Sequence, residues 1–237
     1  MLFVQFLIAS IIMIPLSMAE INGVIISDKG GLNDYSEFII YIKEGSSLPK
    51  LKSKKQKIEI GQVNKKFTPS VSAIQTGSSV DFKNYDDIFH NVFSLTPGSK
   101  FDLGVFKGEQ SFKDDLSSTS NKNSQVTFNK HGKIDIFCNI HEDMMTSLYV
   151  FDHGYFANVN KDGQFKLPTP EHGKITIVLD GNRIKKPIAK KYHVKDLPKF
   201  LKIKFKSVDI KPVKKHLKKD GEQYEKKQWD IDEDDFY

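Results

Sequence analysis

Short segments with the alternation of β-strands, separated by turns, run through most of this chain of 237 residues. Between residues 21 and 179, no stretch keeps the hydrophobic period of a long helix. Residues 126–128 and 134–137, for example, alternate between apolar and polar around a turn at His131 and Gly132. Many short strands with frequent turns predict an all-β chain built as a β-sandwich.

The first residues of the chain are almost wholly apolar. Residues 2–16 contain no charged side chain, and Ser17 and Ala19 follow with the small residues of a signal-peptidase site. We therefore expect a signal peptide at residues 1–19, with Glu20 as the first mature residue. No basic residue precedes the apolar run, which leaves an uncleaved anchor as the alternative, although the run is short for crossing a bilayer. We expect export to the periplasm or outside the cell, without stable membrane insertion once the signal is removed.

Cys138 is the only cysteine in the chain. Exported proteins usually hold their cysteines in disulfide-bonded pairs because their compartment is oxidising, so an unpaired thiol there indicates another role. One interpretation is an inert buried cysteine at the end of a strand. His141 and Met144 follow Cys138 at three-residue intervals on the same short segment. Their presence favours a metal ligand.

The chemistry of these side chains indicates copper. Thiolate, imidazole and thioether suit a copper ion that alternates between Cu(I) and Cu(II), with two imidazoles and one thiolate in a plane and a weak, distant thioether. The missing imidazole has a candidate in His90, which lies in the largely apolar run 89–93. We predict that His90, Cys138, His141 and Met144 bind one type 1 copper. Asn91 either hydrogen-bonds to the ligand loop or is an ordinary turn or capping residue, and both interpretations stay open.

Several motifs also carry a resemblance to a known family. His-Asn-Val-Phe at 90–93, Phe-Asp-Leu-Gly at 101–104 and Cys-Asn-Ile-His-x-x-Met at 138–144 resemble the plastocyanin/azurin-type cupredoxins. They are most similar to exported cupredoxin-like proteins that are often labelled methylamine-utilisation proteins. The similarity covers residues 67–179, where a hairpin expected around Asp162 and Gly163 resembles the carboxypeptidase regulatory-like β-module.

This resemblance implies a Greek-key β-sandwich that binds copper through the same four residues. It favours Met144 over Met145 as the axial ligand, because the two-residue gap after His141 matches the shortest ligand loops of the family. Two residues depart from the family pattern. Ile140 stands where many blue copper proteins have proline, and Asn139 replaces the usual threonine or serine after the cysteine. Both departures concern the reduction potential and the stability of the loop more than binding itself.

We expect four segments along the chain. They are the signal peptide at 1–19, a cupredoxin-like copper-binding domain at 20–152, a small β-module at 153–206 and a charged tail at 207–237. The strands expected near 21–27 and 38–42 belong either to the copper-binding sandwich or to the later module. The tail contains little apolar surface to bury, so we expect it to be partly disordered.

The formal net charge of +6 comes mostly from a lysine-rich run at 185–219. A basic run suggests nucleic acid, an anionic surface or an acidic protein. Because nucleic acid is an improbable partner for an exported chain, we interpret the run as a solvated face or a surface that docks a partner protein.

The sequence predicts an exported carrier of one electron that works with an unknown redox partner protein. One alternative is copper handling, meaning storage, delivery or resistance, and another is a metal-free interaction module with Cys138 simply buried. An enzyme is not expected, because all four inferred ligands are protein groups and no open position for a substrate is evident.

Overall fold

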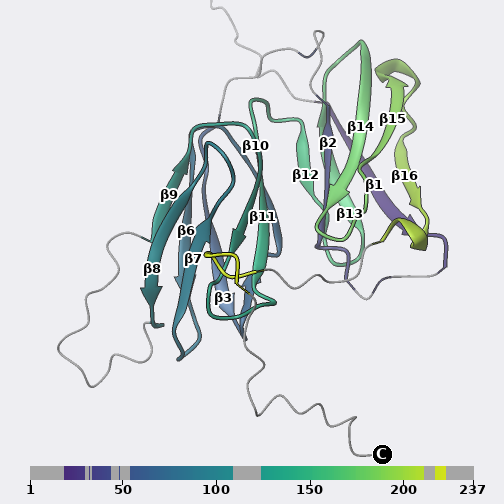
Figure 1. The fold of residues 1–237 in the computed structure, drawn as a ribbon. Coiled ribbons are helices and arrows are strands. Elements are labelled where there is room, and N and C mark those ends of the chain that lie inside the picture. The colour runs from purple at the N-terminus through teal and green to yellow at the C-terminus, as the bar shows by residue number, and fades with distance from the viewer. Residues whose placement is uncertain are drawn as a thin grey trace, which may run out of the picture.

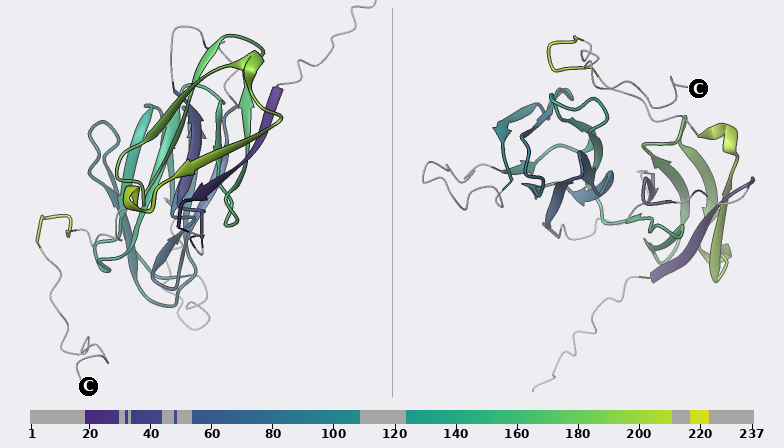
Figure 2. Two further views of the ribbon diagram at one scale, coloured as in Figure 1. Left: turned by 90° about the vertical axis from the view of Figure 1, so that its right-hand side faces the viewer. Right: turned by 90° about the horizontal axis from the view of Figure 1, so that it is seen from below.

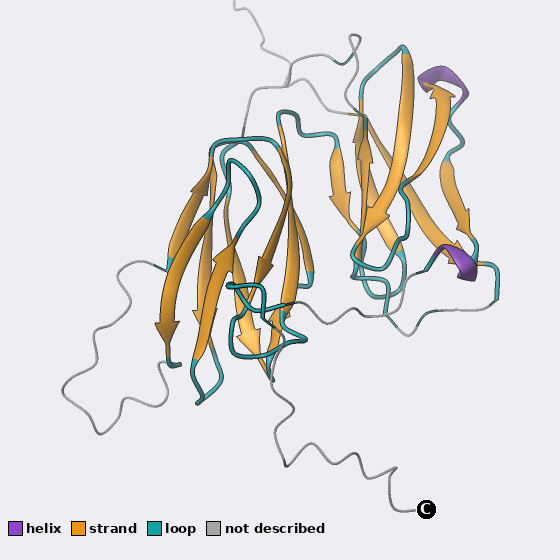
Figure 3. Cartoon of the chain, in the orientation of Figure 1, coloured by secondary structure: helices purple, strands orange, loops and turns teal. Residues whose placement is uncertain are grey.

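The computed structural model describes residues 19–29, 32, 34–43, 48, 54–108, 124–210 and 217–222. Regular structure in these ranges is almost all β, arranged as two sandwiches that lie side by side (Figure 1, Figure 3). Two short 3₁₀ helices, Val194–Asp196 and Ser207–Asp209, also occur. No helix within the described ranges has the length and apolar character needed to cross a bilayer. The prediction of an all-β chain is confirmed.

The first sandwich consists of two facing sheets. Five strands form one sheet in the order β5 (Val71–Gln75), β11 (Met145–Phe151), β10 (Gly132–Phe137), β7 (His90–Ser94) and β8 (Phe101–Phe106). The other sheet has the order β4 (Lys66–Thr68), β3 (Lys57–Val63), β6 (Ser78–Asn84) and β9 (Gln125–Phe128). Strand β5 joins β11 in parallel, as β3 joins β6, while the other neighbours are antiparallel. The chain crosses between the two sheets from β4 to β5, β5 to β6, β6 to β7, β8 to β9 and β9 to β10, whereas β3–β4, β7–β8 and β10–β11 pair within one sheet.

Alternation of apolar and polar residues builds the core of this sandwich. In β6, Val80 and Phe82 are fully buried, whereas Lys83 is exposed. Because successive side chains in a strand point to opposite faces, this pattern turns one face of β6 toward the opposing sheet. Each fully buried large apolar side chain stabilises the fold by about 1.5–3 kcal/mol relative to its exposed state. Cys138 and Met144 belong to the same buried cluster, so the candidate ligands lie at the end of a packed core.

The second sandwich combines strands from both ends of the described chain. One sheet has the order β13 (Gln164–Thr169), β1 (Ala19–Ser27) and β16 (Phe200–Phe205). The facing sheet has the order β12 (Phe156–Asn158), β2 (Phe38–Ile42), β14 (Lys174–Gly181) and β15 (Ile188–His193). Strand β1 is central in its sheet and pairs antiparallel with β13 and parallel with β16.

This pairing answers the question that the sequence left open about the first strands. The expected copper-binding segment 20–152 includes β1 and β2, yet both strands pair only with strands that follow β11. The expected boundary at residue 20 is therefore wrong as a description of the sheets, and the first sandwich starts at β3. Strand alternation is a local pattern that does not specify a pairing partner, so it could not have decided this. The later module is correspondingly larger than the expected segment 153–206, and its independence as a domain stays a prediction.

The hairpin expected around Asp162 and Gly163 does not form as a paired ladder. A turn is present, with Gly163 at φ +83° and its amide bonded to the Asn160 carbonyl at 2.9 Å. The flanking strands, however, enter different sheets, because β12 pairs with β2 and β13 pairs with β1. The two N-terminal strands supply the partners that a local hairpin would otherwise need.

The two sandwiches contact each other through a small apolar cluster of their own. Ile39 from β2 packs with Val71, Ala73 and Tyr149 from β5 and β11. Asn182 adds a hydrogen bond from its Nδ2 to the Ser70 carbonyl at 2.6 Å. Because the second sandwich covers them, β5 and most of β11 are buried on both faces and lack the alternation of a half-exposed strand.

Gly23 predicts a stability effect that tests the placement of β1. A Cβ atom at this position would lie 2.2 Å from Cζ of Phe165 and 2.5 Å from the carbonyl oxygen of Leu201. Because the backbone of Leu201 cannot easily move away, Gly23→Ala is expected to destabilise the fold by about 1–3 kcal/mol. Urea unfolding measures this change, and Asn22→Ala, at the exposed neighbouring position, serves as the control. Equal stability of the two variants would contradict the observed pairing of β1.

The predicted signal peptide lies outside the described residues apart from Ala19, which starts β1. Of the predicted tail, residues 207–210 and 217–222 are described. The turn at 217–222 lies against the first sandwich (Figure 1), although the composition of the tail predicted partial disorder.

Candidate metal centre

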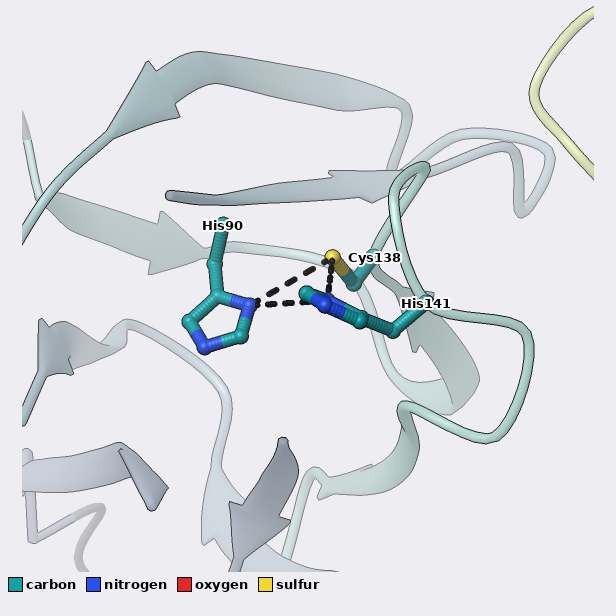
Figure 4. Close-up of side chains that lie close together, drawn as sticks. All are labelled: His90, Cys138 and His141. Atoms are coloured by element: carbon teal, nitrogen blue, oxygen red, sulfur yellow. Dashed lines mark hydrogen bonds between the residues drawn. The ribbon is translucent and has the colours of Figure 1, made fainter. Parts of the chain in front are cut away.

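Neighbouring strands bring the predicted ligands to one end of the first sandwich. His90 is the first residue of β7, and Cys138 directly follows the last residue of β10. These two strands pair through Phe93 and Phe137, which fixes their relative position. His141 lies on the loop that leads from Cys138 to β11, and the three side chains converge (Figure 4).

The three donor atoms form a compact triangle. Nδ1 of His90 lies 3.1 Å from Nδ1 of His141. The sulfur of Cys138 lies 3.9 Å from Nδ1 of His90 and 3.8 Å from Nδ1 of His141. Imidazole and thiolate bind zinc at about 2.0–2.3 Å, and a single ion at comparable lengths fits between all three atoms. Among the described residues, this is the one group of three or more potential ligands found so close together.

Burial differs among the three residues in a way that matters for chemistry. The side chains of His90 and Cys138 are fully buried, whereas His141 is partly exposed. The amide of Ile140 donates a hydrogen bond to the Cys138 sulfur at 3.5 Å. Water is thus kept from the sulfur, while one imidazole of the site reaches the molecular surface.

Backbone hydrogen bonds close the loop that carries Cys138 and His141. The Cys138 amide donates to the Met144 carbonyl at 3.1 Å, and the Met144 amide donates to the His141 carbonyl at 3.2 Å. Met144 is fully buried in the core cluster beside Cys138, whereas Met145 is half-buried at the start of β11. The difference in burial favours Met144 for the axial position. That all four residues ligate copper stays a prediction.

Asp86 is a component of the site that the sequence reasoning missed. Its Oδ2 lies 2.7 Å from Nε2 of His90, the ring nitrogen opposite the one that faces Cys138 and His141. Asp86 lies in the bend between β6 and β7, four residues before His90. An acidic residue four positions before a predicted metal-binding histidine was the available signal, because such histidines usually donate their second N–H to a carboxylate or a carbonyl.

The environment of Asp86 keeps its carboxyl group ionised. Burial by itself raises the pKa of Asp86, but the amide of Lys65, the ring of His90 and the amide of Asn64 outweigh it, so the pKa lies below its ordinary value. The amide nitrogen of Lys65 lies 2.9 Å from Oδ2 of Asp86, and the amide nitrogen of Asn64 lies 2.6 Å from Oδ1. An ionised carboxylate can only accept, so Nε2 of His90 donates the proton of this hydrogen bond. Nδ1 is the ring nitrogen that faces Cys138 and His141, where a metal would bind.

Asn91 hydrogen-bonds to the ligand loop, which was one of the two interpretations that the sequence left open for this residue. Its side-chain oxygen accepts a hydrogen bond from the Asn139 amide at 2.5 Å, and its Nδ2 donates to Oδ1 of Asp102 at 3.3 Å. Asn139 immediately follows Cys138, so Asn91 ties the strand of one candidate ligand to the loop of the other two.

Two other histidines have structural contacts. Nδ1 of His131 lies 2.8 Å from Oδ2 of Asp152. Nδ1 of His153 accepts a hydrogen bond from the Tyr155 amide at 3.2 Å. His153 is buried, and its ring packs against the aromatic side chains of Phe151 and Tyr155.

A family of known proteins is similar to the first sandwich. Residues 54–150 match the family model for copper binding proteins of the plastocyanin/azurin family, and this range coincides with the first sandwich. That part of the chain is similar to the plastocyanin/azurin-type cupredoxins, and copper is the cofactor that its cluster of two histidines and one cysteine suits. A search of curated proteins found no match.

Several solved structures are similar to part of this chain. An oxidized mutant of amicyanin has 16% identity and a TM-score of 0.31, with 39% of this chain and 80% of that chain covered. A pseudoazurin from Sinorhizobium meliltoi has 23% identity and a TM-score of 0.28, with 40% and 72% covered. A purple cupredoxin from Nitrosopumilus maritimus has 17% identity and a TM-score of 0.29, with 39% and 97% covered. The similarities are too low to assign a function by themselves.

Proposed function

We propose that this chain is an exported carrier of one electron. Its type 1 copper is held by His90, Cys138 and His141, with Met144 as the weak axial ligand. The observation that carries the proposal is the convergence of two imidazole nitrogens and one cysteine sulfur within a triangle whose sides measure 3.1–3.9 Å. When bound, copper supplies the one-electron couple, and the protein supplies the ligands and their surroundings.

The surroundings of the donor atoms suit electron transfer. His90 and Cys138 come from paired strands of a packed sandwich, so their positions can change little when the charge of the site changes. A site that reorganises little between oxidation states favours fast transfer. Burial of the sulfur and the Ile140 amide bond also limit water access, which is one way that proteins set a reduction potential.

The partly exposed His141 is the proposed route for the electron. Two exposed apolar side chains lie next to candidate ligands in the sequence, namely Phe89 directly before His90 and Ile140 directly before His141. Exposed apolar surface beside a redox group favours brief association with a partner protein. We propose that a redox partner docks here and exchanges the electron through the His141 ring. Four protein ligands leave no open position for a substrate, so we do not propose an enzyme.

Addition of Cu(II) to the purified mature protein tests this function. The expected results are an intense blue thiolate-to-copper absorption, reversible voltammetry and electron exchange with a cytochrome. Colourless, tight Cu(I) binding without reversible voltammetry would instead support copper storage or delivery. Absence of binding would leave a metal-free interaction module.

A matched pair of variants tests the axial assignment in the same experiment. Met144→Leu is expected to raise the reduction potential, because loss of a weak thioether ligand destabilises Cu(II) more than Cu(I). Met145→Leu makes the same chemical change at the half-buried neighbouring position and is expected to leave the potential unchanged. A shift in Met145→Leu alone would assign the axial role to Met145.

A further inference from the structure

A turn from the C-terminal tail contacts the loop that carries Cys138. The amide of Lys219 donates a hydrogen bond to Oδ1 of Asn139 at 2.6 Å, and Nζ of Lys219 donates to Oδ2 of Asp102. The turn is closed on itself by bonds from the Lys218 amide to the Glu222 carbonyl and from the Gly221 amide to the Lys218 carbonyl, both at 2.9 Å. Figure 1 and Figure 2 draw this turn in yellow, separated along the chain from the strands that it approaches.

The two contacts of Lys219 complete a ring of hydrogen bonds. Asp102 accepts from Nδ2 of Asn91 at 3.3 Å, and Asn91 accepts from the amide of Asn139 at 2.5 Å. Asn139 in turn accepts from Lys219, which donates to Asp102. The ring thus joins β7, β8, the ligand loop and the tail. It passes through the residues that directly follow His90 and Cys138.

Charge compensation within the ring depends on Lys219. Burial alone raises the pKa of Asp102, but hydrogen bonds from Lys219, the Gly104 amide and Asn91 outweigh it, and the pKa lies below its ordinary value. Asp102 is therefore an anion, and the Lys219 ammonium is the cation bonded to it. Without this cation, a negative charge linked to the ligand loop through Asn91 would remain uncompensated.

We propose that Lys219 is a positioning residue for the copper centre. It holds the Asn139 segment of the ligand loop and balances the charge of Asp102, so that the far end of the chain tunes the reduction potential of the site. This inference rests on the proposed function, because the tuning concerns copper bound through Cys138.

Substitution of Lys219 tests the electrostatic part of this role. Lys219→Met leaves Asp102 uncompensated, and a negative charge near the site stabilises Cu(II) over Cu(I), so voltammetry should record a lower reduction potential. Lys219→Arg keeps the charge and should restore the wild-type value. The double variant Asp102→Asn/Lys219→Met removes both charges and should return the potential toward wild type. If the contact between Lys219 and Asp102 acted only by holding the structure, removal of the Asp102 charge as well would not restore the reduction potential.

Lys107→Met is the matched control. The Nζ of Lys107 lies 6.0 Å from the centroid of the Phe89 ring, so this lysine lies near the same end of the sandwich but contacts Phe89 and not the ring of hydrogen bonds. An equal fall in potential in Lys107→Met would mean that any nearby positive charge has the same effect. That outcome, or an unchanged potential in Lys219→Met, would overturn the inference.

Amide hydrogen exchange of the copper-free protein gives a readout that does not depend on the metal. The Lys219 side chain anchors the turn to Asp102, so its loss in Lys219→Met should release the turn together with its main-chain bond to Asn139. The Asn139 amide, which is bonded to Asn91 inside the ring, should then exchange several-fold faster than in the wild-type protein, while core amides such as that of Ile136 stay unchanged. Unchanged exchange at Asn139 would contradict the positioning role even in a protein that turns blue. If the wild-type protein fails to turn blue but the exchange at Asn139 still accelerates, the proposed function fails and the positioning of the loop stands.

Discussion

Cys138→Ser is expected to abolish the intense visible absorption of the copper-loaded protein. This absorption needs a thiolate bonded to copper, and no second cysteine exists in the chain to replace Cys138. A serine hydroxyl is a hard, weakly acidic donor that does not provide the soft sulfur that copper favours. Affinity for Cu(I) should also fall. Visible spectroscopy during titration with Cu(II) measures the first effect, and competition with a Cu(I) chelator measures the second.

Serine is close in size to cysteine, so loss of colour in this variant can be separated from unfolding. Cys138 is fully buried within the core cluster, and thermal unfolding of the copper-free variant should show whether that packing survives. A Cys138→Ser protein that stays folded and keeps the blue absorption would refute the thiolate assignment, and with it the proposed carrier role.

Asp86→Asn is expected to weaken Cu(II) binding by about 10–100-fold, the usual cost of losing a carboxylate that orients a ligating histidine. The Asp86 carboxylate accepts the Nε2 proton of His90 at 2.7 Å and makes Nδ1 a stronger donor. Asparagine keeps an acceptor oxygen but loses the negative charge. Because the charge stabilises Cu(II) more than Cu(I), the reduction potential should rise. Metal titration and voltammetry measure the two effects.

Asp87→Asn provides the comparison for this experiment. It removes the same charge from the adjacent, exposed position, where solvent screens its effect on the site. We expect little change in copper affinity or potential in Asp87→Asn. If the two variants behave alike, the contact between Asp86 and His90 has no specific influence on the metal, and the Asp86 carboxylate serves only to accept the amides of the turn at Asn64 and Lys65.

Candidate ligands could be named from the sequence because the chemistry of three of them depends on a few neighbouring residues. Cys138, His141 and Met144 share one short loop, and only thiolate, imidazole and thioether groups suit copper in this way. His90 was found by its setting in an apolar run. The structure brings its Nδ1 to 3.9 Å from the Cys138 sulfur, across two strands that pair directly.

Asp86 and Lys219 could not be assigned from the sequence with the same reasoning. Acidic and basic residues are common in turns and tails, and most of them are solvated. Their roles depend on which ring nitrogen of His90 faces the metal and on where the tail returns to the sandwich. Both are consequences of packing between segments far apart in the chain, as the contact of Lys219 with Asn139 illustrates.

The sequence by itself determined the strands, the order of the candidate ligands and the kind of metal that they suit. These follow from the two-residue period of strands and from donor chemistry, which are properties of a few neighbouring residues. Only the tertiary structure decided that β1 and β2 join the second sandwich, that Asp86 orients His90 and that a tail turn reaches the ligand loop. The physical reason is that the alternation of apolar and polar residues favours a strand but does not specify which other strand it pairs with. The partner is selected by the free energy of the whole set of long-range contacts.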